Sequence, residues 1–159
     1  MKKFDLKILL PNIITLSGLS FGLSSIRFAL ESDFNLAVIC ILFAGLCDVL
    51  DGMLARHLQS ESDLGAQLDS LSDLLSFGLA PGLLIYMSIF NQESIGAFAA
   101  LAFIIFSCLR LGLYNVQLEK SKTDEGDPEH YFSGIPTPVG AILIMLPLTH
   151  SFMDYNWAY

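Results

Sequence analysis

Residues 48–73 read DVLDGMLARHLQSESDLGAQLDSLSD, and this stretch carries four aspartates between hydrophobic segments. Asp48 directly follows a long, almost wholly apolar run, where a lone carboxylate is costly. At about 100° per residue, Asp48 and Asp51 fall on one side of a helix. The same spacing rule places Asp69 and Asp73 on one side of a second helix. The stretch therefore predicts two helices that each present two carboxylates near a membrane surface.

The composition is that of a membrane protein. Hydrophobic residues make up 53% of the 159 residues and charged residues only 15%, whereas a soluble domain carries about 25% charge. The length predicts a single domain over residues 1–159. The net charge is -8, and no basic patch could neutralise several phosphates, so we do not expect nucleic acid as a partner.

Five apolar stretches are each long enough to cross a bilayer as a helix, which takes about 20 residues. They run from Ile8 to Leu30, Phe34 to Arg56, Leu68 to Phe90, Ile95 to Val116 and Thr137 to Asp154. None has the alternation of a barrel strand, and backbone groups in lipid must be satisfied within the protein. We therefore expect an all-α, polytopic transmembrane helix bundle with five spans.

Basic residues predict the orientation of this bundle. Segments 31–33 and 91–94 contain no Lys or Arg, whereas the other connections and the N-terminus hold most of them. Those basic residues are Lys2, Lys3, Lys7, Arg56, Lys120 and Lys122. Because basic segments stay in the cytoplasm, we expect an inner-membrane protein whose N-terminus and four aspartates face the cytoplasm. The connection 117–135 is expected to be a cytoplasmic loop.

Small residues and proline predict how the helices pack and bend. Gly18 and Gly22 form a GxxxG pattern, which lets helix backbones approach closely. Pro81 and Gly82 are expected to kink the third span, because proline removes a backbone hydrogen bond.

Four carboxylates in one place repel each other and need counter-charge, and Arg56 alone is not enough. Ligands that are all oxygen favour Mg²⁺, Mn²⁺ or Ca²⁺ over zinc. Two such ions about 4 Å apart can bridge a phosphate group, and an unsaturated carboxylate could accept a proton from an attacking hydroxyl. The alternative for any single aspartate is a hydrated helix end at the membrane interface.

The stretch resembles the signature of the CDP-alcohol phosphotransferase family, D-x-x-D-G-x-x-A-R followed, after residues 57–64, by G-x-x-x-D-x-x-x-D. The fixed positions are filled by Asp48, Asp51, Gly52, Ala55, Arg56, Gly65, Asp69 and Asp73. Members of this family are integral membrane enzymes that move a phosphatidyl or similar group from a CDP-linked donor to an alcohol and release CMP. They usually have six membrane helices, one more than the five expected here.

Flanking segments are similar to the bacterial, membrane-bound phosphatidylserine synthases of this family. The similar segments are 10–26 (LPNIITLSGLSFGLSSI), 76–86 (SFGLAPGLLIY), 109–116 (LRLGLYNV) and 131–141 (YFSGIPTPVGA). This resemblance implies transfer of the phosphatidyl group from CDP-diacylglycerol to L-serine, dependence on two divalent cations (Mg²⁺ or Mn²⁺, with Ca²⁺ as an alternative), and a homodimer.

The resemblance also implies roles for single residues. Asp48, Asp51 and Asp69 would be metal ligands, and Asp73 would be both a ligand and the general base. The residues expected to border the CDP moiety are Asn12, Thr15, Gly52, Ala55, Arg56 and Gly65. For Asn12 and Thr15, simple polar packing within the bundle is the alternative.

Arg110 lies inside the fourth span, and Asn115 follows farther along the same span. An intramembrane arginine should pair with an anion, and a guanidinium group suits the serine carboxylate or a donor phosphate. Arg110 and Asn115 are therefore predicted to bind the acceptor or a phosphate. A structural ion pair between Arg110 and one of the aspartates is the alternative.

Two other functions are alternatives. A sibling enzyme could use glycerol 3-phosphate, inositol phosphate or choline, but a phosphorylated acceptor would favour a further basic cluster near the metals. A divalent-cation transporter would favour internal repeats and a site at the membrane midplane. The sequence has no visible repeat, and its carboxylates are expected at one face.

Overall fold

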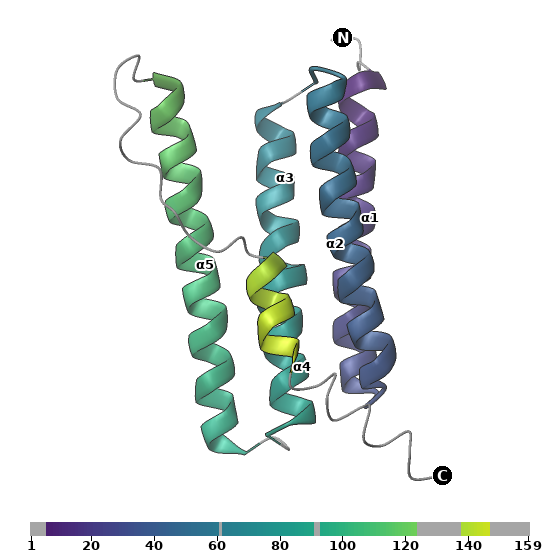
Figure 1. The fold of residues 1–159 in the computed structure, drawn as a ribbon, viewed down its shortest axis with the longest axis vertical. Coiled ribbons are helices and arrows are strands. Elements are labelled where there is room, and N and C mark those ends of the chain that lie inside the picture. Colours follow the sequence, from purple (N-terminus) through teal and green to yellow (C-terminus); the bar gives the residue numbers. More distant parts are fainter. Residues whose placement is uncertain (1–5, 61, 91–92, 124–137, 147–159) are drawn as a thin grey trace.

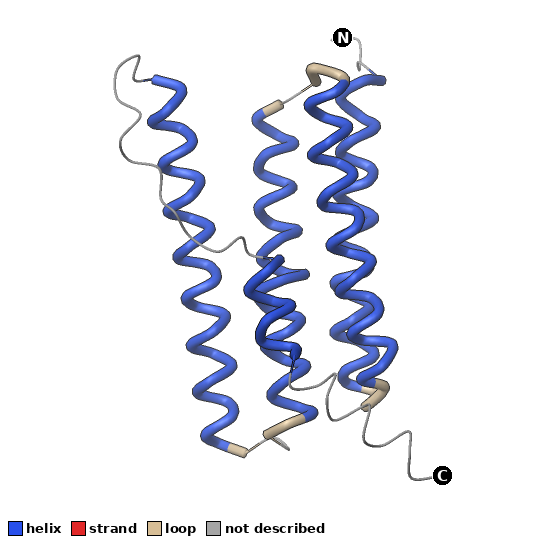
Figure 2. The backbone as a smooth tube through the Cα atoms, viewed as in Figure 1, coloured by secondary structure: helices blue, strands red, loops and turns tan. Residues whose placement is uncertain are grey.

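Every regular secondary-structure element in the described residues is a helix. This computed structural model describes residues 6–60, 62–90, 93–123 and 138–146. Its helices are α1 (Leu6–Leu30), α2 (Phe34–His57), α3 (Asp63–Asp73), the π-helix η1 (Leu74–Leu79), α4 (Ala80–Ser88) and α5 (Ser94–Thr123), and residues 138–146 are also helical. Figure 1 shows long helices running up and down, and Figure 2 shows no strand in the described part of the chain. The all-α prediction is confirmed.

Among the described residues, four helical segments are long and apolar enough to cross a membrane, which fits a multi-pass membrane protein. They are Leu9–Leu30, Phe34–His57, Asp63–Ser88 and Ser94–Val116. The third comprises α3, η1 and α4, which follow one another without a break. Of the fifth predicted span, Thr137–Asp154, residues 138–146 are helical, and the rest lies outside the described residues.

The predicted start of the third helix was wrong by several residues. The helix begins at Asp63 rather than at Leu68. Ser62 caps it, because the Ser62 hydroxyl accepts a hydrogen bond from the backbone N–H of Gly65 at 3.1 Å. Such a cap satisfies a backbone donor that would otherwise lack a partner, so the helix extends beyond its apolar part.

The fourth apolar segment ends at Val116 as predicted, but its helix is longer. Helix α5 continues past Val116 to Thr123, so the first part of the expected loop 117–135 is helical. This extension contains Gln, Leu, Glu and Lys, which are good helix formers. Residues 124–135 lie outside the part of the chain that is described.

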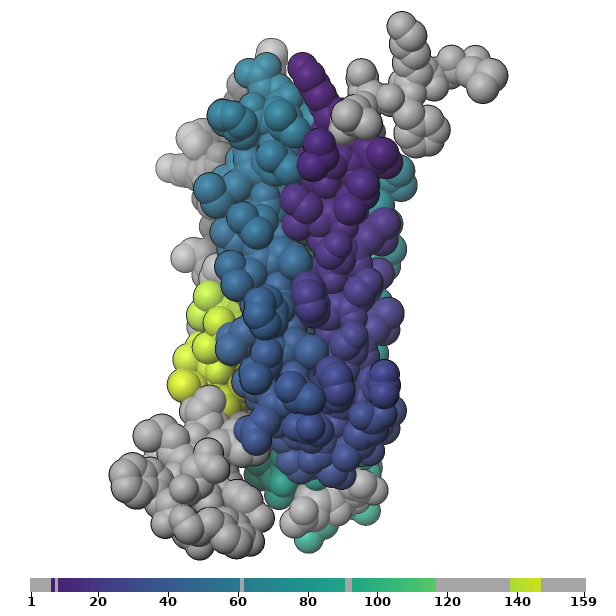
Figure 3. Space-filling model, turned by 90° about the vertical axis from the view of Figure 1, so that its right-hand side faces the viewer, coloured from purple at the N-terminus to yellow at the C-terminus, as the bar shows by residue number. Residues whose placement is uncertain are grey.

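The packed interior consists largely of small residues, while large apolar side chains point outward. The buried apolar residues include Ala29, Ala37, Ala44 and Ala80. By contrast, Leu46 and Phe98 are 56% and 75% exposed. Figure 3 shows α1 and α2 side by side, forming one continuous face of the bundle. Small residues inside and large apolar residues outside suit a bundle whose surroundings are lipid.

Helix α1 packs closely on its neighbours along its GxxxG face. A methyl group added to Gly22 would lie 3.0 Å from the Cα atom of Ser76 in η1. A methyl group added to Gly18 would lie 3.1 Å from the Cβ atom of Cys47 in α2. The prediction that these glycines permit close helix packing is confirmed.

The irregularity near Pro81 is a π-helical turn that lies before the proline. The backbone N–H of Ala80 donates to the carbonyl oxygen of Leu75, five residues earlier. This wider turn directly precedes Pro81, which has no N–H to donate. Gly82 then allows contact with α5, since a methyl group there would lie 2.9 Å from a side-chain carbon of Ile104.

Candidate active site

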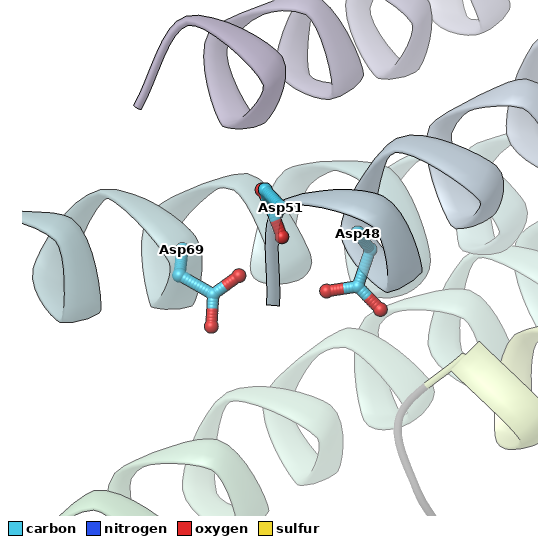
Figure 4. Close-up of side chains that lie close together, drawn as sticks. All are labelled: Asp48, Asp51 and Asp69. Carbon is cyan, nitrogen blue, oxygen red and sulfur yellow. The ribbon is translucent and has the colours of Figure 1, made fainter. Parts of the chain in front are cut away.

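The carboxylate groups of the aspartates in α2 and α3 come together where these two helices lie next to α1. Asp48 and Asp51 lie on successive turns of α2, and Asp69 lies on α3. One carboxylate oxygen from each of the three lies within 4.8 Å of the others. Figure 4 shows the three carboxylates gathered around a common space. Because these hard oxygen ligands can share one divalent cation, the cluster could bind a metal ion.

Asp73, the fourth predicted ligand, lies beside this cluster. It follows Asp69 by about one turn of α3 and lies close enough to Asp48 and Asp69 to interact with them electrostatically. The structure brings Asp48, Asp51 and Asp69 together, and the roles of all four aspartates remain predictions.

Thr15 on α1 contacts this cluster through Asp51. The Thr15 hydroxyl donates a hydrogen bond to a carboxylate oxygen of Asp51, and Asp51 is only 5% exposed. The hydroxyl of Ser72 lies 3.4 Å from the backbone carbonyl oxygen of Thr15. Helix α1 is thereby tied to α2 and α3 at the carboxylates. This contact with a predicted metal ligand did not follow from the sequence.

Asn12 lies one turn before Thr15, close to the start of α3. A methyl group added to Gly65 would lie 3.0 Å from the side-chain oxygen of Asn12 and 3.1 Å from the Ser62 hydroxyl. Glycine at position 65 therefore leaves room for the side chain of Asn12. Two of the residues predicted to border the CDP moiety are thus neighbours, although they are distant in sequence.

The last turns of α2 hold the other predicted CDP-binding residues. The Arg56 side chain is exposed and folds back along its own helix, where its Nε atom donates to the carbonyl oxygen of Gly52 at 3.0 Å. Ala55 is partly buried beside it. The guanidinium group therefore lies at the end of α2 that carries Asp51.

On α5, Asn115 contacts α3, and Arg110 is partly buried. The side-chain amide of Asn115 donates to the hydroxyl of Ser70 at 2.8 Å. Ser70 had no predicted role, although its position between Asp69 and Asp73 on a polar stretch was a signal that could have been used. The predicted acceptor-binding roles of Arg110 and Asn115 are not tested by these contacts.

Arg27 is not part of the site and forms an ion pair with Glu31, one helical turn later. Its Nε atom lies 3.0 Å from the carboxylate of Glu31 one turn later, and both side chains are largely exposed. The connection between α1 and α2 follows directly, and Asp33 caps α2 by accepting a hydrogen bond from the backbone N–H of Leu36.

Comparison with known proteins places this site in a family. The family model for CDP-alcohol phosphatidyltransferases matches residues 8–158. CDP-diacylglycerol–serine O-phosphatidyltransferase of Mycobacterium tuberculosis (strain ATCC 25618 / H37Rv) is 34% identical over 151 residues, covering 94% of this chain and 52% of the relative. The enzyme of the same name from Bacillus subtilis (strain 168) is 35% identical over 144 residues, covering 89% of this chain and 77% of the relative.

An archaeal relative carries a related name. Archaetidylserine synthase of Methanothermobacter thermautotrophicus (strain Delta H) is 34% identical over 146 residues, covering 90% of this chain and 59% of the relative. The chain thus spans about half the length of the mycobacterial relative and about three quarters of the Bacillus relative. The match of the family model over nearly all residues, together with these identities, shows that the chain belongs to the CDP-alcohol phosphatidyltransferase family.

Proposed function

We propose that this protein transfers the phosphatidyl group of CDP-diacylglycerol to the hydroxyl of L-serine and releases phosphatidylserine and CMP. The observation that carries the proposal is the convergence of carboxylate oxygens from Asp48, Asp51 and Asp69 within 4.8 Å. The names of the bacterial and archaeal relatives support serine as the acceptor, because they share serine while their lipid parts differ.

The carboxylate cluster suits two divalent cations, Mg²⁺ or Mn²⁺, with Ca²⁺ as a less favoured alternative. The proposed ligands are Asp48, Asp51, Asp69 and Asp73. The donor set fits because carboxylate oxygens are preferred by these hard ions. When bound, the ions would neutralise the pyrophosphate of the donor and stabilise the charge on the entering and leaving oxygens.

Asp73 is the proposed general base. Its carboxylate takes the proton of the serine hydroxyl as the serine oxygen forms a bond to the phosphorus that carries the diacylglycerol. The bond from this phosphorus to the CMP oxygen breaks, and the electron pair leaves with CMP. Positioning and electrostatic stabilisation supply most of the rate enhancement in such transfers.

The donor nucleotide is proposed to lie over the ends of α1, α2 and α3 that carry the carboxylates. The proposed neighbours of the CDP moiety are Asn12, Thr15, Gly52, Ala55, Arg56 and Gly65. The small side chains at positions 52, 55 and 65 leave room for the nucleotide. The hydrogen bond between Thr15 and Asp51 supports an additional role for Thr15 in orienting this carboxylate.

Arg110 and Asn115 are the proposed acceptor-side or phosphate-binding residues. Both are partly buried on α5, and Asn115 contacts α3 between two of the aspartates. Apart from Arg56 and Arg110, the spans near the cluster carry little positive charge. This favours zwitterionic serine over glycerol 3-phosphate or inositol phosphate.

The proposed setting is the inner membrane, with the N-terminus and the carboxylates at the cytoplasmic face and with the acyl chains of the donor in the bilayer. The excess of Lys and Arg in the connections on that side supports this orientation. A homodimer is proposed from family resemblance.

The test is CMP release from CDP-diacylglycerol by the purified protein with a panel of alcohols. We expect release with L-serine and Mn²⁺ or Mg²⁺, and little with glycerol 3-phosphate, inositol phosphate or choline. Release with another alcohol but not with serine would keep the family chemistry and overturn the acceptor. Specific transport of Mn²⁺ into vesicles without any CMP release would overturn the enzymatic proposal.

A further inference from the structure

A hydrogen bond joins α5 to α3 beside the carboxylate cluster. The side-chain amide of Asn115 donates to the Ser70 hydroxyl at 2.8 Å. The Ser70 hydroxyl lies 2.9 Å from the backbone carbonyl oxygen of Ala66, to which it donates its own proton. A hydroxyl has one proton and two lone pairs, so both hydrogen bonds can exist at once. Ser70 therefore holds a defined orientation in which it accepts from Asn115.

Ser70 lies on the same turn of α3 as two of the aspartates, so a movement of Ser70 would also move their carboxylates. It directly follows Asp69 and precedes Asp73 by less than one helical turn. Asp69 lies in the cluster with Asp48 and Asp51, and Asp73 lies beside it, close to Asp48 and Asp69. A shift of this turn relative to α5 would therefore change the distance and orientation between the carboxylates and the side chains of α5.

Helix α5 has few other contacts with α3. Its close packing lies farther along the bundle, where Gly82 of α4 meets Ile104 and Gly78 of η1 meets Ser107. Figure 1 shows α5 diverging from α3 toward the end at which the N-terminus lies. At this diverging end, the hydrogen bond between Ser70 and Asn115 spans the two helices.

We propose that Ser70 and Asn115 are a positioning pair, which holds α5 at a fixed distance from the aspartates of α3 and so sets the acceptor side of the site. The proposal rests on the proposed function only for its kinetic readout. In this arrangement the side-chain amide nitrogen of Asn115 donates to Ser70. The side-chain carbonyl oxygen of Asn115 is assigned to the acceptor. Ser70 is assigned no contact with a substrate.

The first test measures the distance between the helices and does not depend on activity. Spin labels are placed at the exposed positions Gln67 on α3 and Val116 on α5, after the free cysteines Cys40, Cys47 and Cys108 have been replaced. We expect Ser70→Ala to shift or broaden the distance distribution by about 2 Å, the scale of helix movements at interfaces. Asn115→Ala should do the same, and the double variant should do no more.

A matched control removes a hydroxyl that bonds only to its own helix. Ser17 donates to the carbonyl oxygen of Ile13 at 2.9 Å on the exposed side of α1. Ser17→Ala should leave the distance distribution between labels at 67 and 116 unchanged. An unchanged distribution in Ser70→Ala as well would overturn the positioning role.

The second test separates positioning from metal binding and from direct acceptor binding. Ser70→Ala should lower kcat/KM for serine by about two- to ten-fold, the range expected for one hydrogen bond, whereas Mn²⁺ affinity should stay the same. Ser70→Thr keeps the hydroxyl and should restore the rate. In a double-mutant cycle with Asn115→Ala the losses should be strongly non-additive. Additive losses, or a normal rate in Ser70→Ala, would overturn the proposal, and absence of turnover in the unmodified protein would count against the proposed function alone.

Discussion

The hydroxyl of Thr15 on α1 donates a hydrogen bond to the carboxylate of Asp51 on α2, one of the three carboxylates that lie close enough to share an ion. This bond leaves the second oxygen of Asp51 for other partners and fixes the rotation of the side chain. Partners of this kind orient metal ligands, and their loss commonly weakens metal binding by about 10- to 100-fold. The first helix is therefore part of the site as well as part of the bundle.

We predict that Thr15→Val will weaken Mn²⁺ binding by about ten-fold or more, because valine keeps the shape of threonine but cannot donate. Thr15→Ser should retain most of the affinity. Isothermal titration with Mn²⁺ in detergent measures both. Ser20→Ala is the control, since Ser20 bonds only to its own helix at the carbonyl of Leu16 and should not alter the affinity. If Thr15→Val binds Mn²⁺ as tightly as the unmodified protein does, Thr15 does not orient a metal ligand, and its role is packing or contact with the nucleotide.

A second prediction separates the general base from the other carboxylates. Asp73→Asn should lower the rate of CMP release by about 100-fold or more, because an amide cannot accept the serine proton, while much of the CDP-diacylglycerol affinity remains. Asp51→Asn should instead lose Mn²⁺ binding together with turnover. CMP-release assays measure turnover, equilibrium binding of the labelled donor measures donor affinity, and isothermal titration measures Mn²⁺ binding. Near-normal turnover in Asp73→Asn would remove Asp73 from the role of base.

A third prediction concerns the contact that sets α1 against the third span. Gly22→Val should lower the free energy of unfolding by about 1–3 kcal/mol, because even the first added carbon would lie 3.0 Å from the backbone Cα of Ser76. Thermal unfolding in detergent measures the loss. The control is Gly112→Ala on α5, where an added carbon meets nothing within 4 Å and alanine favours helix. Equal melting temperatures for Gly22→Val and the unmodified protein would contradict the tight packing.

The sequence predicted the carboxylate pairs well, because the spacing of Asp48 and Asp51 on one helix is a local property. It predicted the first four spans from hydrophobicity alone. It missed the start of α3 at Asp63, because the span was predicted from hydrophobicity and the first turn of this helix is polar. That turn is stabilised by the Ser62 cap. The contacts of Thr15 and Ser70 were missed for a different reason, because each depends on how one helix is rotated against another.

The position of the π-helical turn could not be predicted from the sequence either. Pro81 and Gly82 indicated an irregular third span, but the wider turn occupies Leu74–Leu79, before the proline. It follows Asp73 directly, so it changes the direction in which later side chains of this span point relative to the aspartates. Sequence alone did not indicate which side of the proline would carry the irregularity, because helix packing decides it.

The last prediction tests the acceptor side of the proposed reaction at Arg110. This arginine is partly buried on α5, and a planar guanidinium group can bind a carboxylate through two parallel hydrogen bonds, which an ammonium group cannot reproduce. We therefore expect Arg110→Lys to raise the KM for serine by about ten-fold, as for a loss of roughly 1.4 kcal/mol, with little change in the KM for CDP-diacylglycerol. The matched control is Arg27→Lys, because Arg27 forms an exposed ion pair with Glu31 at the other end of α1 and should leave both constants unchanged. If the KM for the donor rises and that for serine does not, Arg110 serves a donor phosphate, and if neither changes while stability falls, it is a structural partner within the bundle.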